Sequence, residues 1–212
     1  MQTVRIAELL GPFMAGPELS PLLVGHLQQY LELLVRWNAR INLTAVRDPE
    51  QIVTRHFGES LFAALVLLGE RVGATESRSL ADVGSGAGFP GIPIKLLAPE
   101  LELTLIEAHN KKATFLREVI RTLGLEGAHV FGGRAERWGK TADLVTLRAV
   151  EQFNRALPTA AELVARGGKL CLLISAGQVS EAQRVLGSGW TWREPNAVPQ
   201  SRSRIVLVGS RL

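Results

Sequence analysis

The stretch Leu80 to Gly91, with the sequence LADVGSGAGFPG, decides the fold of this chain. It is typical of a buried β-strand that runs into a glycine-rich turn and then into the start of a helix. Gly84, Gly86 and Gly88 alternate in this turn, where the missing Cβ atoms permit a sharp backbone path and let a ligand approach main-chain N–H groups. Asp82 lies two residues before the first of these glycines. The stretch therefore predicts a binding site for a nucleotide-like cofactor.

The spacing of the glycines indicates which kind of cofactor the turn binds. A dinucleotide-binding turn has its third glycine or alanine five residues after the first, where this chain has Phe89. A nicotinamide-dependent oxidoreductase is therefore a distant alternative. The order acidic-x-Gly-x-Gly-x-Gly instead resembles motif I of the class I S-adenosylmethionine-dependent methyltransferases, in which the turn carries the methionine end of the cofactor.

A second acidic residue agrees with this resemblance. Glu107 closes the apolar run Leu103 to Ile106, which predicts a second strand. A carboxylate at the end of that strand can accept hydrogen bonds from both hydroxyl groups of a ribose. The expected cofactor contacts are Gly84 and Gly86 to the methionine part, Asp82 to the turn or to the cofactor amino group, Phe89 as an apolar wall or a core residue, and Glu107 to the ribose.

From Leu80 onward, predicted strands and helices alternate, which indicates an α/β fold with a mostly parallel sheet covered on both faces. Seven strands are expected, as in a Rossmann-like methyltransferase sheet, and the last two form a hairpin-like pair. Their ranges are Ser79–Val83, Leu103–Glu107, His129–Phe131, Leu144–Leu147, Lys169–Ile174, Trp190–Arg193 and Arg204–Val208. Helices are expected at Gly91–Leu97, Lys111–Leu123, Gln152–Ala165 and Gly177–Leu186, with Gly124 and Gly167-Gly168 as left-handed residues at helix ends.

Residues 1–78 are predicted to form an N-terminal helical extension, and residues 79–212 the methyltransferase domain as one compact unit. Ser20-Pro21 starts one helix and Asp48-Pro49 starts another, each as a capping residue followed by proline at the first helical position. His56 and Ser60 lie one turn apart on the second helix, so their side chains can meet. The polar stretch from Gly69 to Ser79 is interpreted as the linker.

Composition sets the broad class of the protein. The chain has 212 residues, enough for one good core, and a formal net charge of +4, which permits a phosphate-rich partner without proving one. Its single cysteine, Cys171, excludes an internal disulfide. The start of the chain lacks the pattern of a signal peptide, and the longest apolar run, Leu61 to Leu68, is too short to span a bilayer. We therefore expect a monomeric cytoplasmic protein with no membrane partner and no metal.

Several further groups of residues follow one another along the chain between Leu22 and Val150. They are Arg36-Trp37-Asn38, Asn42-Leu43-Thr44, His56 with Glu59-Ser60, the glycine-rich stretch, Lys111-Lys112 with Phe115-Leu116, Arg134-Ala135-Glu136 and Arg148-Ala149. Together they resemble the RsmG (GidB) family, whose enzymes methylate N7 of one guanine in bacterial 16S ribosomal RNA. The resemblance implies S-adenosyl-L-methionine as the cofactor, and 16S rRNA, in the 30S subunit or an assembly intermediate, as the partner.

The chain departs from the pattern of that family in two places. Glu59 stands where the family usually has aspartate, which leaves a carboxylate at this position. Near the C-terminus, the family usually carries a basic pair before the last strand and a lysine after the fifth. This chain has Gln200–Arg204 and Ser175–Gly177 in those regions.

The type of reaction can also be examined from the residues. Methylation of a pyrimidine carbon needs a cysteine nucleophile, but Cys171 lies within an apolar strand and is interpreted as a core thiol. Methylation of an exocyclic amine often uses an Asn/Asp-Pro-Pro-aromatic loop after the fourth strand, where this chain has Leu147–Val150. A target such as guanine N7 has no proton to remove, so the enzyme needs only to align it and exclude water.

Two arginines are the candidate catalytic residues. Arg148 follows the fourth strand and is expected beside the transferred methyl, where it engages guanine O6, a phosphate or the cofactor carboxylate. Arg134 follows the third strand in a similar position, and Ala135 and Glu136 are expected to border the adenine of the cofactor. Both arginines can alternatively serve as surface salt-bridge residues, and Glu136 as a helix-start carboxylate.

Two other functions are compatible with the same sequence. A small-molecule methyltransferase of this fold predicts affinity for a metabolite and no salt-sensitive binding of RNA. A non-catalytic, cofactor-binding regulator that interacts with RNA predicts cofactor binding without turnover.

Overall fold

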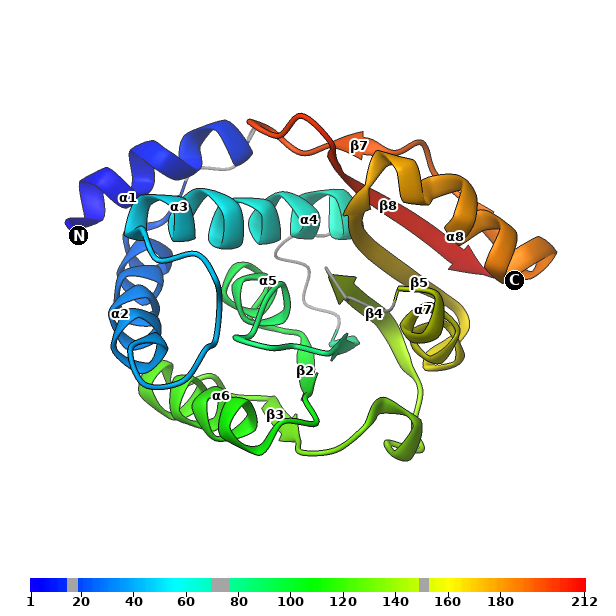
Figure 1. Ribbon diagram of the computed structural model, residues 1–212, viewed down its shortest axis with the longest axis horizontal. Helices are drawn as coiled ribbons and strands as arrows, with labels where there is room; N and C mark the ends of the chain where they lie inside the picture. The colour runs from blue at the N-terminus through cyan, green and yellow to red at the C-terminus, as the bar shows by residue number, and fades with distance from the viewer. Residues whose placement is uncertain (15–18, 70–76, 149–152) are drawn as a thin grey trace.

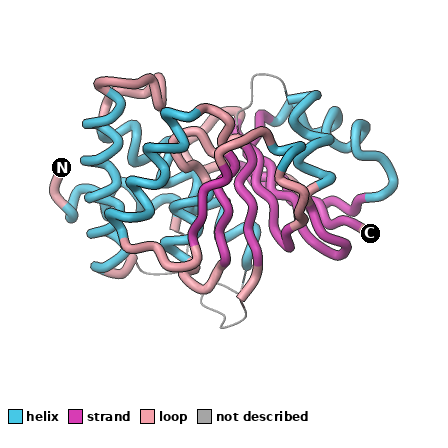
Figure 2. The backbone as a smooth tube through the Cα atoms, turned by 90° about the horizontal axis from the view of Figure 1, so that it is seen from below, coloured by secondary structure: helices cyan, strands magenta, loops and turns pink. Residues whose placement is uncertain are grey.

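The computed structural model describes residues 1–14, 19–69, 77–148 and 153–212. A central sheet separates two helical layers (Figure 1 and Figure 2). The N-terminal helices, together with α5 (Gly91–Leu97) and α6 (Asn110–Leu123), cover one face, and α7 (Phe153–Glu162) and α8 (Val179–Leu186) cover the other. Each face buries its own apolar cluster, as expected for an α/β sheet covered on both sides.

The strands of this sheet have the order β3-β2-β1-β4-β5-β8-β6, with β7 paired to β8. They are β1 (Ser79–Val83), β2 (Glu102–Ile106), β3 (Ala128–Phe131), β4 (Ala142–Arg148), β5 (Val164–Ser175), β6 (Trp190–Trp192), β7 (Asn196–Ala197) and β8 (Arg204–Arg211). The first five strands are parallel, and β8 runs antiparallel to β5 and to β6. The predicted mostly parallel sheet and its terminal pair are confirmed. The prediction of seven strands is wrong, because the sheet has eight in the described part of the chain. The strand that was missed is β7, whose two residues are too few to give a periodic signal in the sequence.

Four helices precede the sheet in the described part of the chain. They are α1 (Thr3–Leu10), α2 (Pro21–Asn38), α3 (Pro49–Ile52) and α4 (Glu59–Leu68). The predicted caps are present, because Ser20 accepts a hydrogen bond from the Leu23 N–H at 3.2 Å and Asp48 accepts one from the Gln51 N–H at 2.9 Å. Gly124 is left-handed at the end of α6, as predicted, with φ of +61°.

The predicted second helix is not regular. A π-helical turn, Val53–Gly58, separates α3 from α4. The Ser60 hydroxyl donates to the main-chain carbonyl of His56 at 2.5 Å, and the His56 ring contacts other residues, so the expected contact between the two side chains is absent. Turns of this kind are frequent at functional sites, and this one lies against a cavity described below.

A second correction concerns Gly167 and Gly168, for which the sequence predicts a helix end. Helix α7 ends earlier, at Glu162, and Val164 already pairs with Ala142 of β4. The register then shifts, and a Cβ at Gly168 would lie 2.8 Å from the carbonyl oxygens of Ala165 and Asp143. These glycines therefore serve an irregularity within β5, which sequence spacing could not distinguish from a helix end. Helix α8 also starts slightly later than expected.

The N-terminal helices and the sheet share one apolar core. Tyr30 of α2 is fully buried against Phe57, Phe89 and Phe115, with ring centroids 5.3, 5.4 and 6.4 Å away.

The expected division of the chain into two parts at residue 78 stays a prediction. Most of the proposed linker, residues 70–76, and the expected helix start at Gln152 lie outside the described residues. In the described ranges, no helix is both long and apolar enough to cross a membrane.

Gly91 provides a test of how tightly the sheet and α5 are packed. A Cβ at Gly91 would lie 2.8 Å from Leu105 Cδ2 and 2.9 Å from Asp82 Cβ. We expect Gly91→Ala to lower the free energy of unfolding by about 1–3 kcal/mol. Gly25→Ala in α2 is the matched control: a Cβ there meets nothing within 4 Å, so we expect stabilisation of about 0.5–1 kcal/mol. Urea denaturation measures both, and equal stabilities for the two variants would contradict the packing described.

Candidate active site

Asp82 lies directly beneath the glycine-rich turn. Its side chain is fully buried and accepts hydrogen bonds from the Thr146 hydroxyl at 2.7 Å and the Gly91 N–H at 3.2 Å. Burial raises the pKa of the Asp82 carboxyl to about 6, although both hydrogen bonds oppose that shift. Of the two roles predicted for Asp82, this geometry favours fixing the turn, because the carboxylate ties the turn to β4 and α5.

Glu107 holds the other side of the same turn. Its carboxylate accepts hydrogen bonds from the Gly86 N–H at 2.8 Å and the His109 N–H at 2.7 Å. The side chain is buried and lines neither of the first two cavities described below, whereas its neighbours Ile106 and Ala108 line the first of them. Glu107 therefore joins the turn to the segment before α6, and its predicted contact with a ribose stays a prediction.

Tyr30 is a third support of the turn, and its role was not predicted. The sequence indicates only that it belongs to the apolar face of a helix. Its hydroxyl donates a hydrogen bond to the Ala87 carbonyl within the turn, and its ring stacks on Phe89. A Cβ at Gly88 would lie 2.5 Å from this hydroxyl, so glycine is needed here for close approach as well as for its φ of +91°.

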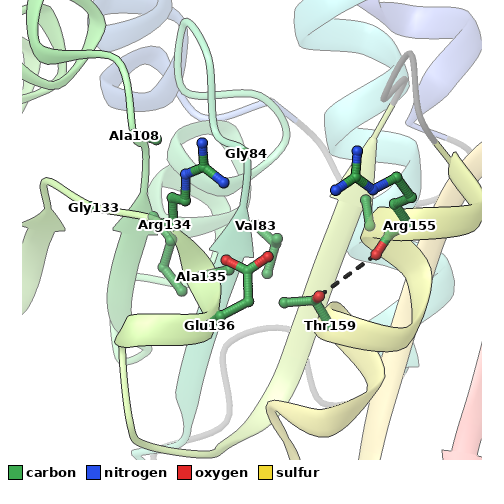
Figure 3. Close-up of a pocket in the computed structure, with 11 residues that line it drawn as sticks. Val83, Gly84, Ala108, Gly133, Arg134, Ala135, Glu136, Arg155 and Thr159 are labelled. Carbon is green, nitrogen blue, oxygen red and sulfur yellow. Dashed lines mark hydrogen bonds between the residues drawn. The ribbon is translucent and has the colours of Figure 1, made fainter.

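A first cavity, of about 500 Å³, opens at the carboxyl ends of β1, β2 and β3 (Figure 3). Ligands of open α/β sheets bind at this edge. Its lining includes Arg134, Ala135 and Glu136, which lie directly after β3 as predicted. Figure 3 shows them facing Arg155 and Thr159 of α7 across the cavity, with Val83 and Gly84 between the two sides. Their contact with a cofactor stays a prediction.

The size of the first cavity and the open backbone of the turn beside it fit a nucleoside cofactor. The volume of this cavity lies within the range of about 300–1,000 Å³ that small-molecule sites occupy. Gly84 and Gly86 have φ of +67° and +58°, and a Cβ at Gly86 would meet only the Gly84 carbonyl oxygen, at 3.8 Å. The backbone of the turn is thus open on its outer side, where a ligand can approach the main chain. Of these two glycines, Gly84 lines the first cavity and Gly86 lines only the second, which is described next.

A second cavity, of about 450 Å³, lies on the other side of Gly84, which lines both. Its polar and aromatic lining comes from the N-terminal segment, from the turn and from the ends of three strands. These residues include Thr44, Arg55, His56, Glu59, Phe89, Lys112, Arg148, Ser175 and Arg204. Phe89 is buried, stacks on His56 at 4.8 Å between centroids and contacts Tyr30, so it is a core residue that also lines this cavity. It does not line the first cavity, and its predicted contact with the cofactor stays a prediction.

Three charged side chains meet in this second cavity. The Glu59 carboxylate is 2% exposed and pairs with Arg148 at 3.1 Å and with Arg204 at 2.6 Å. Burial raises the pKa of Glu59, which both arginines oppose, and burial lowers the pKa of Arg148, which Glu59 opposes. Arg204 belongs to the C-terminal region where the sequence departs from the family pattern, and it still brings a cation to this cavity.

Arg148 is held at one end of its guanidinium group. Its Nη2 donates to the Arg55 carbonyl at 2.6 Å, to Glu59 at 3.1 Å and to His56 Nδ1 at 3.1 Å. The guanidinium carbon also lies 5.9 Å from the centroid of the Phe89 ring. These three hydrogen bonds share one nitrogen, so they fix the position of the group without engaging both arms of its fork.

His56 is neutral in this arrangement. Because an arginine can only donate, Nδ1 accepts, and Nε2 therefore carries the proton and donates to the Thr44 hydroxyl at 2.8 Å. Burial lowers the pKa of His56 to about 3, and the charges of Arg148 and Arg55 act in the same direction. This geometry is that of a structural histidine, although the residue also lines the cavity.

The depressed pKa of His56 predicts acid sensitivity. The ordinary pKa of histidine is 6.5, so between pH 6.5 and 3 the unfolded state binds a proton at His56 that the native state does not bind. The free energy of unfolding therefore falls as the pH drops through this range, by at most about 1.4 kcal/mol per pH unit. Asp82, with its raised pKa, changes stability in the opposite direction between about pH 4 and 6. We therefore expect His56→Gln to gain stability relative to the wild type between about pH 7 and about pH 5, measured by urea unfolding. A constant difference would contradict the buried neutral state.

The two candidate catalytic arginines do not lie together. Arg134 lines the first cavity, and Arg148 lines the second. Both lie at the carboxyl end of a strand, as expected, because Arg134 follows β3 and Arg148 is the last residue of β4. Strands β2 and β1 separate β3 from β4, however, and the two arginines face different cavities. Glu59, which pairs with both Arg148 and Arg204, was not predicted as a site residue, and neither was Arg204. The ion pair between Glu59 and Arg204 joins α4 to β8, which are far apart in the chain, so no local pattern in the sequence predicts it.

The strand order, the glycine-rich turn and the cavity at the strand ends define a class I S-adenosylmethionine-dependent methyltransferase fold. A solved structure with the same fold is magnesium protoporphyrin IX methyltransferase from Synechocystis with bound SAM. Its TM-score is 0.66 at 13% identity, with 86% of this chain and 97% of that chain covered. At such low identity, the likeness concerns the fold alone.

Comparison of sequences identifies the family. The family model described as rRNA small subunit methyltransferase G (GidB) matches residues 24–187, so the chain belongs to this family. A ribosomal RNA small subunit methyltransferase G from an Exiguobacterium species is 40% identical over 172 residues, which cover 78% of this chain and 70% of the relative. Another, from Stenotrophomonas maltophilia, is 39% identical over 198 residues, covering 92% and 89%. The resemblance seen in the motifs is thereby confirmed.

Proposed function

We propose that this protein transfers the methyl group of S-adenosyl-L-methionine to N7 of a guanine in the 16S rRNA of the small ribosomal subunit. The observation that carries the proposal is that Gly84 lines both cavities. A cofactor on one side of the turn and a base on the other can meet there. Membership of the family and the names of its relatives support the ribosomal substrate.

The residues of the first cavity fit the cofactor. Gly84 lines this cavity and offers open backbone to the methionine part of the cofactor, and Ala135 and Glu136 offer an edge to its adenine. Gly86 lines the second cavity, on the other side of the turn, and its contact with the methionine part stays a prediction. When bound, the cofactor supplies an electrophilic methyl group on a sulfonium. We assign Arg134 to the cofactor side of the reaction, because it lines this cavity and not the one that contains Arg148.

The second cavity lacks a free general base among the described residues that line it, which favours an acceptor with no proton to remove. His56 is neutral with both ring nitrogens engaged, and Glu59 is paired with two arginines. Cys171, the only cysteine, is fully buried, and burial raises the pKa of its thiol to about 12, which argues against a cysteine nucleophile. Guanine N7 is an acceptor of the required kind, so catalysis here is alignment and exclusion of water.

Arg148 is the proposed catalytic residue of this cavity. A guanidinium that donated to N7 would block the lone pair that attacks, so Arg148 is assigned to guanine O6 or to a phosphate. Its anchoring by Glu59, His56 and Arg55 holds it where the base would enter. Phe89 and His56, stacked on each other, form an aromatic wall of the same space.

Substitution of the target atom tests the proposal. A 16S transcript made with 7-deazaguanosine carries carbon in place of N7, and we expect it to accept no methyl group. The matched transcript with ordinary guanosine, or a subunit assembled from it, is the positive control. Equal labelling of the two RNAs would move the methyl group to another atom of the base and overturn the assignment.

We propose further that the protein acts in the cytoplasm as a monomer. The location follows from the proposed ribosomal substrate. Light scattering of the purified protein tests the oligomeric state: a mass near 23.0 kDa is expected, and a mass twice as large would contradict it.

A further inference from the structure

A third cavity, of about 330 Å³, lies between the loop after α2 and the start of α6. Helices α2 and α6 pack side by side (Figure 1), so this loop and this helix start meet at one end of the pair. The cavity is lined by Arg40, Ile41, Asn42, His109, Lys111 and Lys112. Three of these six side chains are cationic (Arg40, Lys111 and Lys112), none is acidic, and only Ile41 is apolar.

No carboxylate in the described part of the chain forms an ion pair with the cations of this cavity. Ion pairs in the described ranges join Arg5 to Glu8 and Glu50, Arg121 to Glu118, Arg184 to Glu181, and Arg148 and Arg204 to Glu59. None of these pairs involves Arg40, Lys111 or Lys112. The positive potential of the cavity is therefore available to an anion from outside the chain.

The loop that carries Arg40 is held in one conformation. Asn38 is buried, and its side chain accepts hydrogen bonds from the N–H groups of Leu43 and Thr44 at 2.9 and 3.1 Å. Arg47 donates to the Asn38 carbonyl at 2.7 Å and to the Asn42 side chain at 3.0 Å. The backbone that bears Arg40 is thus fixed before any ligand arrives, and Lys111 and Lys112 belong to helix α6, which lowers the entropic cost of binding.

This third cavity adjoins the proposed acceptor site. Lys112 lines both it and the second cavity, where Arg55, Arg148 and Arg204 add further positive charge. Consider a ligand with anionic groups repeated along its length and a base that projects into the second cavity. Such a ligand would bring an anionic group close to the third cavity, because the two cavities share Lys112. A polynucleotide has this form, with one phosphate for each base.

We propose that the third cavity binds a backbone phosphate of the RNA strand next to the target guanine. The inference rests on the proposed function, because it assumes that the acceptor is a nucleotide within RNA. Arg40 and Lys111 provide the contact specific to this cavity, and Lys112 connects it to the acceptor site. Contacts of this kind position the strand without reading its sequence.

The salt dependence of RNA binding tests the proposal. In the variant Arg40→Gln/Lys111→Gln, we expect the Kd for the 16S target RNA to rise about tenfold at moderate salt. The slope of log K against log salt should become shallower by about 0.7–0.9 for each phosphate that the variant no longer binds. The Kd for S-adenosyl-L-methionine should not change, because neither residue lines the first cavity.

The matched control is Lys140→Gln/Arg166→Gln, which removes the same charge at exposed positions near the amino ends of β4 and β5, away from the proposed site. This control should keep the wild-type salt slope. A wild-type slope in the cavity variant, or an equal change in both variants, would overturn the proposal. Methyl transfer by the wild type is measured in parallel, so that RNA binding without transfer would refute the proposed function while leaving the phosphate site standing.

Discussion

Replacement of Gly84 by valine is expected to raise the Kd for S-adenosyl-L-methionine by at least about 100-fold. Gly84 has a φ of +67°, a conformation that β-branched residues avoid, and it lines both cavities. A valine would therefore strain the turn and place its side chain in the space assigned to the reacting groups. Isothermal titration calorimetry measures the loss of binding directly.

Gly124→Val is the control for this prediction. Gly124 has nearly the same backbone conformation, with φ of +61°, but it ends α6 and lines neither the first nor the second cavity. We expect similar strain and a similar loss of thermal stability in the two variants, with cofactor binding kept only in Gly124→Val. A wild-type Kd in Gly84→Val would refute the assignment of the glycine-rich turn.

Loss of Arg148 should have the largest effect on methyl transfer itself. We expect Arg148→Ala to lower kcat by on the order of 100-fold, because the acceptor would lose the group that aligns it. The Kd for S-adenosyl-L-methionine should change little, since Arg148 lines the second cavity rather than the first. Single-turnover assays with labelled cofactor separate the chemical step from binding.

The same substitution also removes one of the two partners of Glu59. Leaving a buried carboxylate with one partner fewer is costly, and we expect a destabilisation of about 3 kcal/mol. Adding Glu59→Gln to Arg148→Ala removes that under-compensated charge and should restore part of the stability without restoring activity. Recovery of kcat in the double variant would show that Arg148 acts only by stabilising the fold.

The parts of the site that could be predicted from the sequence are those built from local pattern. The glycine-rich turn lies within a dozen residues of one strand, and the row from Arg134 to Glu136 directly follows another. Because the carboxyl ends of parallel strands share one edge of a sheet, their common location follows from the alternation of strands and helices.

The parts that were missed depend on contacts between distant segments. Tyr30 donates to a carbonyl 57 residues away, and Glu59 of α4 pairs with Arg204 of β8. Neither contact leaves a periodic signal, so the sequence predicts Tyr30 only as a core residue. The prediction for the glycines of β5 was wrong for a related reason, because a left-handed or crowded glycine looks the same in sequence whether it ends a helix or serves a strand irregularity.

The most direct test of the proposed function is the identity of the modified nucleotide. Labelled methyl from S-adenosyl-L-methionine is offered to 16S RNA and to 30S particles from a strain that lacks the gene, and the product is mapped by mass spectrometry. We predict a single N7-methylguanine in the 16S RNA. Transfer to another atom or to many sites, or no transfer to either substrate by protein that binds the cofactor, would contradict the account.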